Sequence, residues 1–328
     1  MWRIWCERPM PEQYRHLAAD AELVWRGPDD TGMAGLLRSM AGARAAIASA
    51  YVRYDGQLFD RLPALQVVSR TGIGVDGVAV DEATERGVVV CNTPDVPSIA
   101  TAEFTIALML FAVKRLGRCT RQLHGQERPD FFTMHDAIEL AGKQLGLVGL
   151  GRIGGRVARI ALAFGMEVAV YDPYISQARA DEAGVQRVDS LEQLLGMADV
   201  VSLHLPATAE TRGLINARSL AQTKRGALLV NAARGALVDE DALAAALQNG
   251  QLSAYATDVF AQEPPPPDHP LLQLPNVVAT PHVAGATLES KAQLWPLAIT
   301  QALQVMRGER PPHVVNPEVW EGRRGARP

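Results

Sequence analysis

Three ionisable side chains in the last third of the sequence have the types that reduction of a carbonyl group requires. They are Arg234 in the segment NAARG, Glu263 in DVFAQEP and His282 in TPH. A cation holds a carboxylate and polarises a carbonyl, an imidazole exchanges a proton near neutral pH, and a neighbouring carboxylate favours the protonated imidazole. Together they are candidate catalytic residues. The alternative is a surface salt bridge and a buried structural histidine.

Short apolar runs precede each of these residues and predict buried parallel strands. Ligands of open α/β sheets bind outside the carboxyl ends of such strands, so the three side chains are expected to converge there. The predicted strands of this half of the chain are residues 145–148, 167–171, 198–205, 227–230, 253–260 and 277–280.

A glycine motif follows the first of these strands. Gly149, Gly151 and Gly154 have the spacing G-x-G-x-x-G, and an amphipathic helical pattern comes directly after them. The first glycine permits a tight turn, the second lets the backbone approach a pyrophosphate, and the third lets the helix pack closely on the strand. The helix N-terminus then offers free N–H groups to the phosphates.

A carboxylate ends the second strand of this half. Asp172 stands at about the distance from Gly149 where an acidic residue binds the ribose hydroxyls of NAD. A carboxylate would repel the 2′-phosphate of NADP, and the next arginine is only Arg179, so NAD is the predicted cofactor. The alternative is a structural β-α-β turn in which Asp172 opens the loop before Pro173.

Residues 1–96 alternate in the same way and predict a smaller α/β domain. The expected strands are residues 1–6, 45–51, 65–69 and 88–91, with a helical turn at 81–86. Between two of them, Gly72 and Gly74 leave backbone N–H groups exposed, which suits either an anion-binding nest or an ordinary turn. The residues alone do not separate these two interpretations.

Two prolines in residues 92–98 mark a domain boundary, and a helix is expected from Ser98 to Arg118. It is apolar on most faces and must be buried on several sides. We expect it to pack against a second subunit in a homodimer, with burial inside the monomer as the alternative. Residues 119–142 read as a surface loop or arm, a helix over 239–248 is capped by Asp239, and residues 288–306 form a last helix.

Composition limits the possible classes of protein. A chain of 328 residues, 48% hydrophobic, suits two soluble domains, and a net charge of −4 gives no reason to expect nucleic acid or a membrane as a partner. Cys6, Cys91 and Cys119 are widely spaced, which favours a reducing compartment and no zinc site. The first residues lack the pattern of a secretion signal, and no apolar run is long enough to span a bilayer, so a cytoplasmic location is expected.

Taken together, the segments GLGRIG, YDP, LHLP, NAARG, DVFAQEP and TPHVAGAT resemble the D-2-hydroxyacid dehydrogenase family, in the family's order and over residues 60–305. The resemblance implies that Arg234 binds a 2-keto acid, that His282 is the proton donor and that Glu263 hydrogen-bonds His282. It also implies two doubly wound α/β domains, Rossmann-like and flavodoxin-like, with a cleft between them and hinges near Pro94 and Gly285. The split substrate domain would comprise residues 1–96 and 285–328, and the NAD-binding domain residues 97–284.

The expected site residues follow from the motifs and the resemblance, and no metal is expected. The expected cofactor-binding residues are Gly149, Gly151, Arg152, Ile153, Gly154, Asp172, His204, Pro206, Thr211, Ala232, Asp258 and His282. Asp258 is expected to contact the nicotinamide carboxamide, and His204 to be a wall of the cofactor site. The expected substrate-binding residues are Thr71, Gly72, Ile73, Gly74 and Arg234, since the family's loop at this place offers N–H groups to the substrate carboxylate. The remaining histidines lack a motif and are expected at the surface or in packing: His16, His124, His135, His269 and His313.

Departures from the family bear on the substrate. The D-N-V-D segment of many members reads Asp76-Gly-Val-Ala79, and the Asn-Ser pair of phosphoglycerate dehydrogenases is Pro97-Ser98. The slot of their phosphate-binding arginine lies near Ser49, although Arg53 is close. A small 2-keto acid such as glyoxylate or hydroxypyruvate is therefore expected. Phosphoglycerate, formate or phosphite dehydrogenation, or an NAD-sensing corepressor without turnover, are the alternatives.

Overall fold

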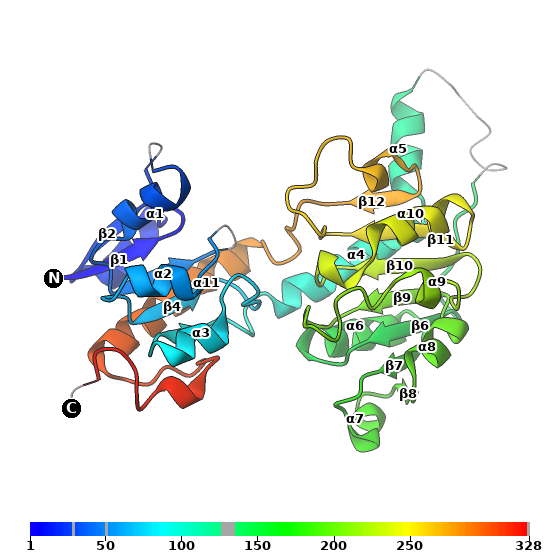
Figure 1. Ribbon diagram of the computed structural model, residues 1–328. Coiled ribbons are helices and arrows are strands. Elements are labelled where there is room, and N and C mark those ends of the chain that lie inside the picture. Colours follow the sequence, from blue (N-terminus) through cyan, green and yellow to red (C-terminus); the bar gives the residue numbers. More distant parts are fainter. Residues whose placement is uncertain (28–29, 50–51, 126–134, 327–328) are drawn as a thin grey trace. The chain divides into compact units, whose positions relative to one another are not determined.

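The computed structural model describes residues 1–27, 30–49, 52–125 and 135–326. The chain folds into two compact units. One comprises Met1–Pro97 together with Ala286–Pro328, and the other Ser98–Gly285. The two ends of the chain thus build one unit and its middle builds the other (Figure 1).

The first unit contains a parallel five-stranded sheet in the order β2-β1-β3-β4-β5, a flavodoxin-like arrangement. Its strands are β1 (Trp2–Cys6), β2 (Ala21–Trp25), β3 (Ala45–Ala48), β4 (Val67–Arg70) and β5 (Val89–Cys91). Strand β2 was not predicted, because it lies at the sheet edge and its residues mix polar and apolar types. Strand β3 ends at Ala48, before the predicted end, and residues 50–51 lie outside the described part of the chain.

Helices cover both faces of this sheet. They are η1 (Glu12–Ala18), α1 (Gly32–Met40), α2 (Gly56–Arg61), α3 (Val80–Glu85), α11 (Leu288–Arg307) and η4 (Pro317–Val319). The predicted last helix is confirmed as α11. Its residues Ile299 and Ala302 pack in one core with Ile4, Ile47 and Val67, so the C-terminal segment completes the core of the N-terminal one.

The second unit contains seven parallel strands in the order β12-β11-β10-β9-β6-β7-β8. They are β6 (Gln144–Val148), β7 (Glu167–Tyr171), β8 (Gln186–Arg187), β9 (Val200–Leu203), β10 (Ala227–Asn231), β11 (Leu252–Thr257) and β12 (Val277–Ala279). The order reverses direction between β6 and β9, which defines a doubly wound sheet and its switch point. The six predicted strands are present. The added β8 is two polar residues long, too short to leave a pattern in the sequence.

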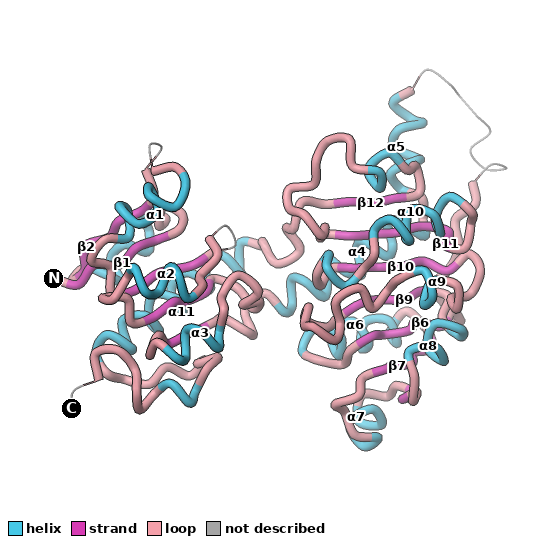
Figure 2. Tube along the Cα trace, viewed as in Figure 1, coloured by secondary structure: helices cyan, strands magenta, loops and turns pink. Residues whose placement is uncertain are grey.

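Helices pack on both faces of this sheet too, so that the strands form a middle layer (Figure 2). They are α4 (Ser98–Val113), α5 (Leu116–His124), α6 (Arg152–Ala163), α7 (Gln177–Glu182), α8 (Leu191–Met197), α9 (Ala217–Leu220), η2 (Gly235–Leu237), α10 (Glu240–Gln248) and η3 (Pro270–Gln273). The predicted cap of α10 is confirmed, because the Asp239 side chain accepts from Ala242 N at 3.1 Å.

The predicted helix from Ser98 to Arg118 was wrong in its length. Helix α4 ends at Val113, because Arg115 adopts a left-handed backbone with φ of 52°. A second helix, α5, then covers residues where a loop was predicted, and none of its side chains is buried. Residues 126–134 of the predicted arm lie outside the described part.

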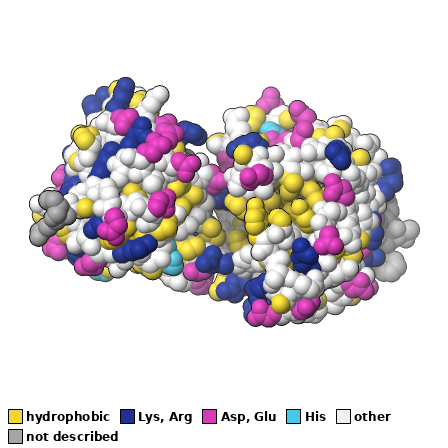
Figure 3. Space-filling view, turned by 60° about the horizontal axis from the view of Figure 1, so that its bottom comes forward, with side chains coloured by type: hydrophobic (Ala, Val, Ile, Leu, Met, Phe, Trp, Pro, Cys, Tyr) yellow, Lys and Arg dark blue, Asp and Glu magenta, His cyan; other side chains and the backbone are white. Residues whose placement is uncertain are grey.

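The surface carries both signs of charge. On the face shown in Figure 3, acidic and basic side chains are interspersed, in keeping with the net charge of −4. Within the ranges that the structure describes, every helix falls short of the length or the apolar character needed to cross a membrane.

Candidate active site

The parallel register brings most of the predicted site residues of the second unit to one edge of its sheet. Gly149 follows β6, Asp172 follows β7 and His204 follows β9. The segments that contain Arg234, Glu263 and His282 follow β10, β11 and β12. Because all these strands run parallel, their carboxyl ends share one edge, on both sides of the switch point.

Backbone contacts explain each glycine of the turn after β6. Gly149 has φ of 99°, and a Cβ there would lie 2.6 Å from the carbonyl oxygen of His204. A Cβ on Gly154 would lie 2.3 Å from the carbonyl oxygen of Gly149, so helix α6 touches the turn directly. Gly151 is exposed, with open space where a Cβ would be, and it is the N-cap of α6. A ligand can therefore approach the backbone there.

This turn fits the pyrophosphate of a dinucleotide. Gly151 has no side chain to cap α6, and a helix N-terminus without a side-chain cap suits an anion beside its first turn, which begins with Arg152 and Ile153. The Asp172 carboxylate accepts from Leu150 N and from Tyr174 N, each at 2.9 Å. It is thereby fixed beside the glycine turn, where an adenosine ribose would follow the phosphates.

The loop after β9 is held by its own side chains. His204 Nε2 lies 2.9 Å from Ser202 Oγ, and burial lowers the pKa of His204 to about 4. The ring is therefore neutral at neutral pH and cannot serve there as an acid, which suits the predicted role as a wall. Thr211 Oγ1 donates to the Pro206 carbonyl at 2.7 Å and accepts from Thr208 N at 2.7 Å.

A buried asparagine shapes the turn that carries Arg234. Asn231 Nδ2 donates to the Arg234 carbonyl at 2.9 Å, and Asn231 Oδ1 accepts from Ala233 N at 3.0 Å. Both ends of one side chain thus fix the turn, with the half-buried Ala232 inside it. The sequence analysis did not assign this role to Asn231, although an asparagine before a turn is a known signal for such bonds.

The imidazole and the carboxylate predicted to act together are in direct contact. His282 Nδ1 lies 2.6 Å from Glu263 Oε2, with 47% and 36% of the two side chains exposed. Glu263 Oε1 also accepts from Phe260 N at 3.1 Å. Burial raises the pKa of Glu263, but His282, the Phe260 N–H and the charge of Arg234 together lower it further, so the net shift is downward. Glu263 is thus kept ionised beside the ring.

Asp258 holds the segment on which His282 stands. Its buried carboxylate accepts from Thr280 Oγ1 at 2.6 Å, from Val283 N at 2.9 Å and from Ala284 N at 2.7 Å. Its carbonyl accepts from His282 N at 2.8 Å, and His282 has φ of 55°. The nicotinamide contact implied by the family resemblance remains a prediction, whereas the structure shows Asp258 as an anchor for this loop.

In the first unit, the carbonyl groups of the predicted substrate loop have hydrogen-bond partners within the unit. The carbonyl of Gly72 accepts from Thr93 N at 3.0 Å, that of Ile73 from Asn92 Nδ2 at 2.8 Å and that of Gly74 from the Arg70 side chain at 2.9 Å. Among the described contacts, none uses the N–H groups of these three residues. Thr71 is tied to β3, through its N–H and hydroxyl to Ala48 O. This geometry favours the anion nest over an ordinary turn.

Comparison with known proteins finds relatives of one family. A sequence model described as the D-isomer specific 2-hydroxyacid dehydrogenase, NAD binding domain, matches residues 106–284. The chain is 36% identical to a glyoxylate reductase of Korarchaeum cryptofilum, over 97% of this chain and 96% of that one. It is 41% identical to a D-3-phosphoglycerate dehydrogenase of Methanocaldococcus jannaschii, over 86% of this chain but only 53% of that protein. The chain spans about half the length of the phosphoglycerate dehydrogenases it matches.

Solved structures are similar over nearly the whole chain. A protein of Thermus thermophilus has a TM-score of 0.86 at 38% identity, with 95% of this chain and 99% of that one covered. A D-lactate dehydrogenase from Aquifex aeolicus, complexed with NAD and lactic acid, has a TM-score of 0.84 at 28% identity, with 95% and 98% covered. The fold and the glycine turn define an NAD-binding α/β protein. The chain belongs to the D-isomer specific 2-hydroxyacid dehydrogenase family.

Adjacent glycines give a matched test of the turn. We expect Gly154→Ala to lower the free energy of unfolding by about 2 kcal/mol or more, because its Cβ would overlap the Gly149 carbonyl. Gly155, with open space around a Cβ, is the control, and Gly155→Ala should raise stability by about 0.5–1 kcal/mol. Urea denaturation measures both, and equal effects of the two changes would contradict the packing argument.

Asp172 is expected to decide between the two dinucleotides. The wild type should bind NADH about 100-fold more tightly than NADPH, because like charges brought together cost several kcal/mol. Asp172→Asn keeps an acceptor for the Leu150 N–H but removes the charge, so the preference should fall about tenfold. Fluorescence titration with both cofactors measures the ratio. An unchanged ratio would mean that another group selects the cofactor.

Proposed function

We propose that the protein is an NAD-dependent oxidoreductase that interconverts a small 2-keto acid and its D-2-hydroxy acid, with glyoxylate or hydroxypyruvate as the type of substrate. The observation that carries this proposal is the 2.6 Å contact between His282 Nδ1 and Glu263 Oε2 at the sheet edge that holds the glycine turn. Three free cysteines suit a reducing compartment, and we infer that the protein works in the cytoplasm.

Each side chain then has one task. Bound NADH supplies the hydride. The Nε2 face of the His282 ring gives a proton to the carbonyl oxygen as it is reduced, while Glu263 stabilises the charged ring and fixes its orientation. Arg234 binds the substrate carboxylate and polarises the carbonyl. The N–H groups of residues 72–74 are further donors for the carboxylate.

Phosphoglycerate is the second candidate substrate, because several relatives at 40–41% identity are named D-3-phosphoglycerate dehydrogenases. The end of β3 supports a substrate without a phosphate. There the buried Glu7 carboxylate accepts from Ser49 N and, at 2.7 Å, from Val52 N. A carboxylate thus occupies N–H donors near the slot where phosphoglycerate dehydrogenases carry a phosphate-binding arginine, so these donors are not open to a phosphate.

A panel of keto acids with NADH tests the proposal. Glyoxylate or hydroxypyruvate should give the highest kcat/KM, ahead of 3-phosphohydroxypyruvate, in an assay of NADH absorbance. His282→Asn should lower kcat about 1000-fold, because it removes the general acid. Asparagine is the suitable replacement because it tolerates the left-handed backbone at this position.

The control for this variant is cofactor binding, which should weaken far less than kcat falls in a fluorescence titration, since His282 is one of several expected cofactor contacts and the glycine turn is untouched. A preference for 3-phosphohydroxypyruvate would establish the second candidate. If no keto acid oxidised NADH, the proposed activity would be wrong.

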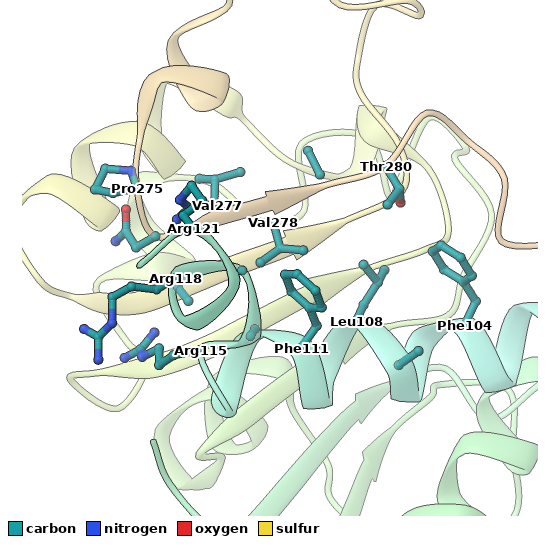
Figure 4. A pocket seen from close by; sticks show the side chains of 16 residues that line it. Phe104, Leu108, Phe111, Arg115, Arg118, Arg121, Pro275, Val277, Val278 and Thr280 are labelled. Atoms are coloured by element: carbon teal, nitrogen blue, oxygen red, sulfur yellow. The ribbon is translucent and has the colours of Figure 1, made fainter. Parts of the chain in front are cut away.

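We also propose that the protein is a homodimer through the region of residues 98–118. Ten of the sixteen residues of α4 are buried in the monomer, so most of the helix needs no partner. A stripe of Phe104, Ala107 and Phe111 remains and lines a groove of about 410 Å³, bounded by β12 and by three arginines of residues 115–121 (Figure 4). Phe111 is 38% exposed, and Leu123 on the neighbouring α5 is 75% exposed. A second copy would cover these apolar side chains.

Replacement of one residue in this groove should separate the subunits. Phe111→Glu is expected to give a particle near the chain mass of 35.4 kDa in light scattering. The reason is that removing a carboxylate from water into an apolar interface costs more free energy than the contact provides. Phe164→Glu is the control, since Phe164 is similarly exposed but lies outside the groove, and it should keep the wild-type mass. A monomeric wild type would refute the dimer.

A further inference from the structure

Two carboxylates hold adjacent N–H groups in the segment that leads to Glu263. Glu263 Oε1 accepts from Phe260 N at 3.1 Å, and Glu240 Oε1 accepts from Ala261 N at 2.9 Å. Glu240 is the first residue of α10 and comes from another part of the chain. The segment is therefore fixed from outside by Glu240, not only by its own carboxylate.

Glu240 is in turn held by a histidine that lacks a motif. His269 Nε2 lies 3.3 Å from Glu240 Oε2, and His269 Nδ1 accepts from Leu271 N at 3.3 Å. Since Nδ1 is an acceptor, the proton of the neutral ring is on Nε2 and faces Glu240. Only 13% and 19% of the two side chains are exposed. The ring also packs edge-on against Phe260, with centroids 5.3 Å apart.

Backbone also packs against the same segment. A Cβ on Gly235 would lie 1.9 Å from the carbonyl carbon of Phe260, so the residue after Arg234 packs directly against this segment. Phe260 and Ala261 are thus held both by the turn after Arg234 and by Glu240 with His269. A displacement of the segment would move Glu263 relative to His282.

We propose that Glu240 and His269 are positioning residues for the Glu263–His282 pair, an inference that rests on the proposed function. Neither side chain contacts Glu263 or His282 in the described structure; they act through the Ala261 N–H and the Phe260 ring. A hydrogen bond between two partly buried side chains adds little net stability, so fixing this segment is the benefit that the geometry offers. By fixing this segment, Glu240 and His269 orient the Glu263 carboxylate, which in turn favours the Nδ1–H form of the His282 ring.

The test compares two carboxylates in the first turn of one helix. Glu240→Ala should lower kcat about tenfold with KM for NADH nearly unchanged, because the acid is misplaced and the cofactor turn is not. It should also shift the pH profile of kcat. Asp241→Ala removes the same charge from the same turn at an exposed position, and it should leave both unchanged. Glu240→Gln keeps an acceptor for Ala261 N, so its kcat should fall less than that of Glu240→Ala.

A spectroscopic measurement needs no turnover. The ring ¹⁵N signals of His282, assigned by their loss in His282→Asn, should report the Nδ1–H tautomer at high pH in the wild type and in Asp241→Ala. In Glu240→Ala, or in Glu240→Gln if the first variant does not fold, the share of the Nε2–H tautomer should rise. His269→Phe should also raise the share of the Nε2–H tautomer. The double variant Glu240→Ala with His269→Phe should lose no more kcat than Glu240→Ala alone.

Unchanged tautomer signals in the Glu240 variants would overturn the inference, as would a loss of kcat with an unshifted pH profile. A wild type that reduces no keto acid would refute the proposed function instead. In that case the ring signals alone would still decide whether Glu240 positions the pair.

Discussion

The short contact between His282 and Glu263 depends on a backbone that has little freedom on either side of it. Asp258, fully inside the protein, binds the segment after β12 through Thr280, Val283 and Ala284. Three charge-assisted hydrogen bonds to one carboxylate are strong, and they place His282 in a left-handed conformation that a histidine rarely adopts. The backbone of these loops therefore determines where His282 and Glu263 lie, and the contact between their side chains follows from it.

Carboxylates bind loop backbone in the same way at several places in both units. Asp172 joins the glycine turn to the end of β7, and Glu7 holds the segment after β3. The physical reason is common to them. A strand end of a parallel sheet leaves N–H groups without partners, and an ionised carboxylate accepts two of them at once. These carboxylates make the loops at the carboxyl edge of a sheet rigid without a larger apolar core.

The sequence predicted those features that depend on neighbours along the chain. The glycine motif, the apolar strands and the cap at Asp239 are local, and all were found. The end of the helix near Arg115 was missed because it follows from the left-handed backbone of this residue, and arginine is not a residue type that indicates such a conformation. The anchoring role of Asp258 was missed for another reason: its partners lie more than 20 residues away, and periodicity carries no information about such pairs.

The return of α11 to the first unit affects the order in which the protein can form during synthesis. One face of the five-stranded sheet is covered by Ile299 and Ala302, which leave the ribosome long after β1 to β5. The middle unit is continuous in sequence and has all its strands before that point. The middle unit can therefore fold before the first unit is complete, while the opening strands, made earliest, keep an uncovered apolar face until the last helix emerges.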